Sequence, residues 1–204
     1  MELLSNDEPE IIEKAARVLR AGGVILYPTD TLYGLGADAL SDEAVAKVKE
    51  IKGRDAAKPI HAIVADVEMA NQYVEFGEKG FALACAYMPG PLSLILKKRA
   101  GVDTGIGKNM DTFCIRIPDN RFCIELARAF GKPYTTTSAN RAGGTTGRSV
   151  REILEQLGEK ASLIDLVIDA GELPERKPST IVNVSTADAV IEREGAISRA
   201  ELTL

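Results

Sequence analysis

The chain has 204 residues, of which 45% are hydrophobic and 27% charged, the proportions of an ordinary soluble globular protein. Its net charge of −5 gives no overall basic footprint for nucleic acid, and no apolar run approaches the roughly 18 residues that span a bilayer. The acidic start has no signal-peptide pattern, so we expect a cytoplasmic protein that forms one domain over residues 1–204. Three cysteines without a C-x-x-C pair, and His61 as the one histidine, disfavour a disulfide framework, a zinc site and a catalytic triad.

Capping and periodicity signals alternate helices with strands along most of the chain. Asn6 or Asp7 can cap a first helix that ends at Gly22-Gly23, and Ser41 opens a second helix that ends near Gly53. Further helices are expected at 66–75, 79–88, 120–130 and after the capping box Ser149-x-x-Glu152. Strands are expected at 24–27, 59–64, 92–96, 113–117, 134–137 and in the segments DLVIDAG, STIVNVS and AVIERE. Because the tail is rich in strands, we expect an α/β fold with a twisted mixed β-sheet flanked by helices.

Polar side chains follow the first strand, in the segment TDTLYGLG at 29–36. Hydroxyls at a strand end, beside glycines that permit close backbone approach, can bind a small polar ligand. A turn rich in local hydrogen bonds is the alternative, and taken alone it is favoured.

A cluster of cations, Lys52, Arg54 and Lys58, stands at the end of the second helix. These side chains can complement the helix dipole, or they can form a basic arm that neutralises a polyphosphate. The sequence does not choose between the two interpretations.

A strand ending in hydroxyls at 135–138 leads into a glycine-rich loop and then a helix. Exposed backbone N–H groups at such a place suit an anion, although neither a Walker A loop nor a GxGxxG fingerprint is present. We favour an anion site slightly over a surface loop with a good cap.

Two arginines lie on strands, Arg116 inside the apolar run 113–117 and Arg193 at the end of another strand. A lone arginine on a buried strand needs an acidic partner or a ligand. A structural ion pair and a binding role are equal alternatives here.

Seven segments resemble, in this order, signature stretches of the YrdC-like family, whose members include the threonylcarbamoyl-AMP synthases. They are PTDTLYGLGADAL, IKGRDAAKP, MPGPLSLIL, CIRIPDN, TSANRAGG, PSTIVNV and REGAIS, from about residue 14 to residue 198. The resemblance implies a YrdC-like fold, a twisted mixed sheet around a concave, basic surface.

The resemblance also implies the roles of individual residues. The K-x-R and S-x-N signature makes Lys52, Arg54, Ser138 and Asn140 the expected catalytic residues. The implied ATP-binding residues are Arg54, Lys58, Thr112, Ser138, Thr146 and Arg193, and the implied threonine-binding residues are Thr31, Arg116, Thr136 and Ser179. No metal ligand is implied. Some members carry a histidine near the threonine site, at the position aligned with Ile63. His61 lies two residues earlier and so on the same face of that strand. We expect His61 to be an ordinary strand residue and not a replacement for that histidine.

The implied activity is that of a nucleotidyltransferase, L-threonylcarbamoyl-adenylate synthase. L-Threonine and bicarbonate give a carbamate, whose oxygen attacks the α-phosphorus of ATP and releases pyrophosphate. Because the reacting groups are anionic, the site needs cations and hydroxyls more than a histidine base. We expect Mg²⁺ to arrive on the ATP phosphates. The implied partners are downstream tRNA threonylcarbamoyl-transfer proteins and tRNA or double-stranded RNA, for N6-threonylcarbamoyladenosine modification of tRNA, with no membrane.

Two alternatives stay open: a YciO-like paralogue, and a double-stranded RNA-binding module without synthase activity. The intact K-x-R and S-x-N signature favours a synthase over the first. The acidic net charge argues modestly against the second as the main role.

Overall fold

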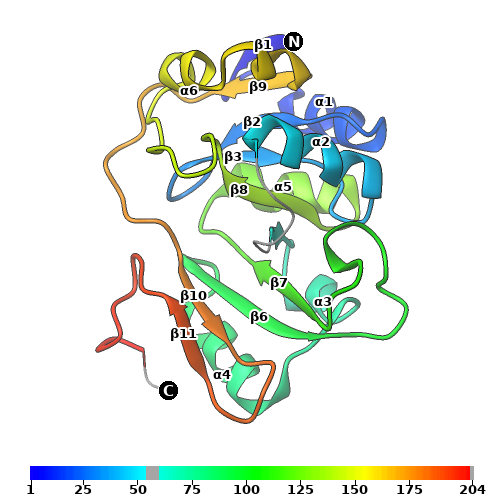
Figure 1. Cartoon of the computed structure of the whole chain (residues 1–204), viewed down its shortest axis with the longest axis vertical. Helices are drawn as coiled ribbons and strands as arrows, with labels where there is room; N and C mark the ends of the chain where they lie inside the picture. Colours follow the sequence, from blue (N-terminus) through cyan, green and yellow to red (C-terminus); the bar gives the residue numbers. More distant parts are fainter. Residues whose placement is uncertain (54–59, 203–204) are drawn as a thin grey trace.

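The protein is built on one mixed sheet that runs the length of the molecule (Figure 1). The computed structural model describes residues 1–53 and 60–202. In these residues the strands are β1 (Glu2–Ser5), β2 (Ile25–Pro28), β3 (Tyr33–Gly36), β4 (His61–Ile63), β5 (Val74–Glu75), β6 (Leu92–Lys98), β7 (Thr112–Arg116), β8 (Tyr134–Ser138), β9 (Leu166–Asp169), β10 (Thr180–Asn183) and β11 (Val190–Arg193). The helices are α1 (Ile11–Arg20), α2 (Asp42–Lys52), α3 (Val67–Ala70), α4 (Gly77–Tyr87), α5 (Arg121–Phe130) and α6 (Val150–Leu157), with short 3-10 helices η1 (Gly105–Gly107) and η2 (Gly158–Leu163).

The sheet contains both parallel and antiparallel pairs. Its order is β1-β9-β2-β3-β8-β4-β7-β6-β10-β11, and β5 adds to β6 outside this path. The pairs β4–β7 and β6–β10 are parallel, whereas β2–β3, β3–β8 and β6–β7 are antiparallel. The mixed α/β fold expected from the strand-rich tail is therefore confirmed.

Helices cover both faces of the sheet around β2. Ile25 and Tyr27 pack in one cluster with α1 and α5, while Val24 and Leu26 pack in another with α2 and α6. Successive strand residues point to opposite faces, so a strand between two helix layers has to be apolar at every position. This explains why the run 24–27 shows no alternation of apolar and polar residues.

The other half of the sheet is packed differently on its two faces. Leu92, Leu94 and Leu96 of β6 share a core with Leu83 of α4. Ser93 alternates with them and so points to the opposite face. That face carries buried polar side chains, and it forms part of the wall of the cavity described below.

The second helix begins and ends where the sequence predicts. The Ser41 hydroxyl accepts a hydrogen bond from the Ala44 N–H at 3.2 Å, and Gly53 ends α2 in the left-handed region at φ 57°. The expected cap of the first helix at Asn6 or Asp7 is wrong, because α1 starts at Ile11 without a side-chain cap. Among the described residues, no helix is long and apolar enough to cross a membrane.

Three short strands do not appear in the sequence-based expectation. β1 pairs with β9, whose residues lie 164 positions further along the chain, as in the pair Glu2–Leu166. β3 forms a hairpin with β2, and β5 lies where the helix 66–75 was expected to continue. β1 and β5 are thus held by partners outside their local pattern, and β3 pairs with the distant β8 as well as with its neighbour β2.

Candidate functional site

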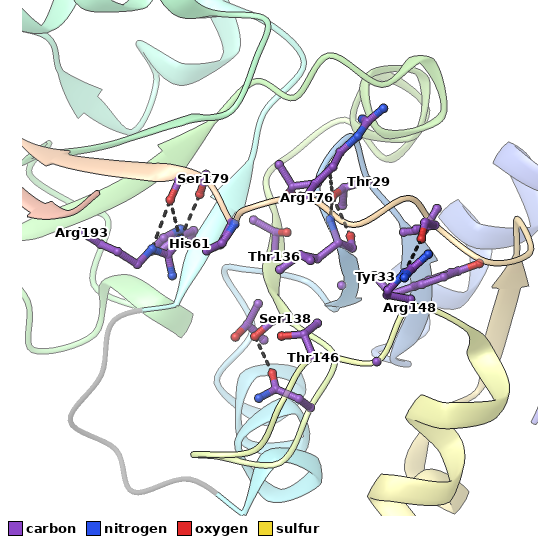
Figure 2. Close-up of a pocket in the computed structure, with 18 of the residues that line it drawn as sticks. Thr29, Tyr33, His61, Thr136, Ser138, Thr146, Arg148, Arg176, Ser179 and Arg193 are labelled. Carbon is purple, nitrogen blue, oxygen red and sulfur yellow. Dashed lines mark hydrogen bonds between the residues drawn. The ribbon is translucent and has the colours of Figure 1, made fainter. Parts of the chain in front are cut away.

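A cavity of about 1210 Å³ lies against the middle of the sheet (Figure 2). Its wall comes from the turn after β2, the ends of α2, β7 and β8, the loop before α6, the segment 173–179 and the end of β11. Single drug-sized ligands occupy pockets of roughly 300–1,000 Å³. The cavity therefore has room for two reactants at once.

Most of the predicted site residues meet at this cavity. Those that line it are Thr31, Lys52, Arg116, Thr136, Ser138, Asn140, Thr146, Ser179 and Arg193. The predicted residues Arg54 and Lys58 lie outside the described residues. Thr112 is not among the lining residues, because it starts β7 opposite Lys97 and stands about 13 Å along the strand from Arg116.

The turn after β2 has local hydrogen bonds and also contributes to the cavity wall, the two alternatives that the sequence allowed for this segment. The Thr29 hydroxyl accepts the N–H groups of Thr31 and Leu32, both at 3.1 Å, and donates to the Leu32 carbonyl at 2.7 Å. Thr29 therefore makes the local turn. The Thr31 hydroxyl instead accepts a hydrogen bond from Arg116 at 3.0 Å, on the cavity wall.

Arg116 has both the ion pair and the exposure to a cavity that the sequence left as alternatives. Its side chain is buried, and its Nη2 lies 2.6 Å from Oδ1 of Asp30. Its Nε donates to the Gly90 carbonyl at 3.1 Å. The sequence reasoning missed Asp30, although it stands between the two threonines singled out in TDT.

Lys52, the first residue of the K-x-R signature, contacts both Ser138 and Asn140 of S-x-N. The buried ammonium of Lys52 donates to the Ser138 carbonyl, to the Asn140 carbonyl at 3.0 Å and to Asn140 Oδ1 at 3.3 Å. The Ser138 hydroxyl donates to Asn140 Oδ1 at 2.5 Å, and Asn140 Nδ2 donates to the Gly144 carbonyl at 2.7 Å. This network fastens the end of α2 to the loop after β8, so it fixes the shape of one cavity wall.

The glycine-rich loop is tied to residues 170–179, the crossing segment that connects β9 to β10 (Figure 1). Arg148 donates from Nε to the Leu173 carbonyl at 2.9 Å and pairs with Glu172 at 2.8 Å. The Leu173 N–H donates back to the Arg148 carbonyl at 2.9 Å. At the start of the segment, Tyr33 donates its hydroxyl proton to the Gly171 carbonyl at 2.8 Å, and burial raises the pKa of Tyr33 to about 12. The crossing segment is therefore anchored at several points where it borders the cavity.

The cap of α6 departs from a complete capping box. The Ser149 hydroxyl accepts from the Glu152 N–H at 3.3 Å, as expected. The Glu152 carboxylate accepts from the N–H of Arg148, at 2.9 Å, rather than from that of Ser149. These two contacts fix the N–H groups of Arg148 and Glu152 and so hold the loop before α6 against the start of the helix.

Arg193 holds Ser179 in place at the far side of the cavity. Its Nη2 lies 2.8 Å from the Ser179 carbonyl and 3.2 Å from the Ser179 hydroxyl, which also contacts the Ser93 hydroxyl at 3.0 Å. Burial, with the nearby charge of Arg116, lowers the pKa of Arg193 from its usual value. His61 lines the same region, opposite Thr136 in the β4–β8 register, as Figure 2 shows.

His61 and Ile63, two residues apart on β4, have different surroundings. Ile63 is fully buried in the core with Tyr27 and Tyr134, whereas His61 is half-buried at the cavity. The chain therefore carries its histidine where a side chain of this strand reaches the cavity.

The family model Sua5/YciO/YrdC, described as telomere recombination, matches residues 17–195. The chain belongs to this family. The resemblance predicted from the seven segments is thereby confirmed.

Two relatives illustrate the similarity in sequence. A putative threonylcarbamoyl-AMP synthase from Methanocaldococcus jannaschii is 35% identical over 196 residues, covering 96% of this chain and 91% of the relative. A threonylcarbamoyl-AMP synthase from Pyrococcus abyssi is 32% identical over 192 residues, covering 94% of this chain but 56% of the relative. The chain thus spans nearly all of the first relative and little more than half of the second.

Solved structures of the family share the fold. P. abyssi Sua5 complexed with L-threonine superposes with a TM-score of 0.86 at 31% identity, covering 96% of this chain and 57% of that one. E. coli YciO superposes with a TM-score of 0.80 at 27% identity, covering 95% and 93%.

Proposed function

We propose that this chain is an L-threonylcarbamoyl-adenylate synthase, a nucleotidyltransferase that joins L-threonine, bicarbonate and ATP and releases pyrophosphate and water. The observation that carries the proposal is that one cavity gathers residues predicted for both substrates. The names of the relatives and the threonine complex of P. abyssi Sua5 support it.

The threonine side of the site is centred on Arg116. Its guanidinium binds the carboxylate of the amino acid, and the hydroxyl of Thr31, 3.0 Å from Nη1, lies within reach of the same substrate. Thr136 contributes mainly through its backbone, and Ser179 is held from behind by Arg193. This arrangement leaves the substrate amine free to form a carbamate with bicarbonate.

The nucleotide side is formed by the loop after β8 together with Arg193. Ser138 and Thr146 offer hydroxyls to the phosphates, and Lys52 with Asn140 keeps the loop in shape. Arg54 and Lys58 complete the phosphate contacts in this proposal. Thr112 has no contact with the cavity among the described residues, so its role rests on the sequence resemblance alone.

The charge of the cavity suits the reaction. Its described lining includes five basic side chains, Lys52, Arg116, Arg148, Arg176 and Arg193, against two carboxylates, Glu175 and Glu192. Carbamate, bicarbonate and the triphosphate are all anions, so bringing them together requires such an excess of positive charge. The carbamate oxygen then forms a bond to the α-phosphorus as the bond to the leaving pyrophosphate breaks.

We infer that Mg²⁺ enters as part of the MgATP substrate. Within residues 1–53 and 60–202, no group of three or more His, Cys, Asp or Glu side chains is placed to hold a metal ion. Phosphate oxygens and water are the ligands that Mg²⁺ prefers when a protein offers few carboxylates. We further propose that the reaction takes place in the cytoplasm and supplies the proteins that transfer the threonylcarbamoyl group to tRNA.

Pyrophosphate release from MgATP tests the proposal, with L-threonine or bicarbonate omitted in turn. We expect release that needs both. Release that needs neither would indicate another ATP-cleaving activity, and no release from folded protein would move the assignment to a YciO-like or RNA-binding role.

A further inference from the structure

Asp30 is placed to control the arginine that faces the amino acid. Its side chain is nine-tenths buried, and Oδ1 accepts a hydrogen bond from Nη2 of Arg116 at 2.6 Å. Oδ2 accepts from the N–H of Asp119 at 3.2 Å. The backbone carbonyl of Asp30 accepts from Nη1 of Arg176, in the crossing segment, at 2.5 Å.

Asp30 contacts the guanidinium but does not itself reach the cavity wall. Arg116 lines the cavity and Asp30 does not. The other donors of Arg116 are also directed, since Nη1 donates to Thr31 and Nε to the Gly90 carbonyl. A guanidinium has five N–H groups, so these contacts leave one on each terminal nitrogen for a ligand.

We propose that Asp30 is a positioning residue of the amino-acid site, which fixes the plane of the Arg116 guanidinium so that its remaining N–H groups meet the substrate carboxylate. This inference rests on the proposed function. Arginine recognises a carboxylate well only when the planar fork is aligned with it, because two parallel hydrogen bonds need a defined orientation.

The ion pair also changes how selectivity arises. Asp30 offsets part of the charge of Arg116 before any substrate is present, so the pair attracts an anion less strongly than an unpaired guanidinium would. Recognition then depends on directed hydrogen bonds, which distinguish a carboxylate from a neutral amide of the same shape. Because loss of Asp30 would increase the net charge at the site but misalign the fork of Arg116, we assign the selectivity to the alignment and not to the charge offset.

Asp30→Asn is the informative substitution because it keeps the size of the side chain. Whichever way the amide is turned, its NH₂ faces a donor, either Arg116 or the N–H of Asp119. We expect the L-threonine concentration for half-maximal pyrophosphate release to rise about 10- to 100-fold, while that for ATP stays within about twofold.

Asp38→Asn provides a matched control. Asp38 is also buried, accepts one backbone N–H (Leu40, 2.9 Å) and one cation (Lys132, 2.5 Å), but does not line the cavity. Its substitution removes a similar ion pair and is expected to leave the threonine requirement unchanged.

A second readout separates positioning from a structural role. L-Threoninamide carries the amine and hydroxyl of threonine without the carboxylate, and the wild-type chain is expected to prefer L-threonine strongly over it. In Asp30→Asn this preference shrinks about tenfold or more. If Asp30→Asn does not fold, the same measurements are made on Asp30→Glu, which keeps the charge but displaces it.

A failure of the Asp30 inference and a failure of the proposed function give different results. Wild-type protein without threonine-dependent release contradicts the proposed function itself. With active wild type, a folded Asp30 variant overturns the inference if its threonine requirement and its preference over threoninamide match those of the wild type, or if both substrate requirements change equally.

Discussion

Lys52→Met removes the ammonium at the centre of the signature network and keeps the length of the side chain. In the folded protein this ammonium donates to the carbonyls of Ser138 and Asn140 and to the Asn140 side chain. Lys52 is almost fully buried at 4% exposure, so its oxygen partners are not readily solvated by bulk water when the ammonium is lost.

The size of the effect follows from those partners. A hydrogen bond from a charged donor contributes about 1.5–3 kcal/mol, and the contributions within one network are not additive. The variant also avoids burying an ammonium, which offsets part of the loss. We therefore expect a loss of about 2–4 kcal/mol, which lowers the melting temperature of a chain of this size by about 5–15 °C.

Thermal and urea unfolding of Lys52→Met measure this loss, with Lys47→Met as the control. Lys47 is on the same helix but is exposed and donates to one carbonyl, that of Gly22, at 2.9 Å. Its substitution is expected to change stability by less than about 0.5 kcal/mol. A Lys52→Met protein as stable as the wild type would refute the scaffold role and leave Lys52 as a ligand contact only.

Three further predictions concern the arginine, the thiols and the metal. Arg116→Ala is expected to raise the threonine requirement in pyrophosphate release far more than the ATP requirement; equal effects would remove Arg116 from its proposed role. Iodoacetamide at pH 8 is expected to modify Cys85 alone in the folded protein and all three cysteines in urea. Cys85 is exposed, whereas burial raises the pKa of Cys123 to about 12 and the pKa of Cys114 further. Because burial raises their pKa, the thiols of the folded protein keep their protons at a pH where the thiols of the unfolded chain have lost theirs. Their contribution to the free energy of unfolding is therefore complete below about pH 8.5 and declines as the pH rises toward 12. We expect the urea concentration at the midpoint of unfolding to be lower at pH 10 than at pH 8. A chelator is expected to stop turnover without lowering the melting temperature of the ligand-free protein; a lowered melting temperature would indicate a metal held by the protein itself.

Features set by neighbouring residues could be predicted from the sequence. The limits of α2 follow from Ser41 and Gly53, whose capping contacts span a few residues. The buried strand β2 follows from its unbroken apolar run. These local signals place most of the elements correctly.

Features that depend on distant partners could not be predicted in this way. β1 is a strand because it pairs with β9, whereas its own residues show no pattern that distinguishes a strand from the segment before a helix. The pairing of Asp30 with Arg116 joins residues 86 positions apart, so no local spacing reveals it. Sequence reasoning left an ion pair and a ligand as alternatives for Arg116, and the geometry shows that one side chain has the ion pair and also faces the cavity.

The resemblance grouped residues that local patterns kept apart. The segments around Lys52 and Ser138 read separately as a charge cluster and a polar loop. Only the fold brings Lys52 into contact with Ser138 and Asn140. Thr112, which the resemblance also assigns to the nucleotide, is not among the described residues that line the cavity, so its assignment stays a prediction.

Incubation with MgATP, L-threonine and ¹³C-labelled bicarbonate, followed by mass spectrometry of the nucleotides, tests the central claim most directly. The account predicts an adenylate that contains threonine and is heavier by one mass unit than the product from unlabelled bicarbonate. AMP or ADP without such a product, from folded protein with all three substrates present, would contradict it.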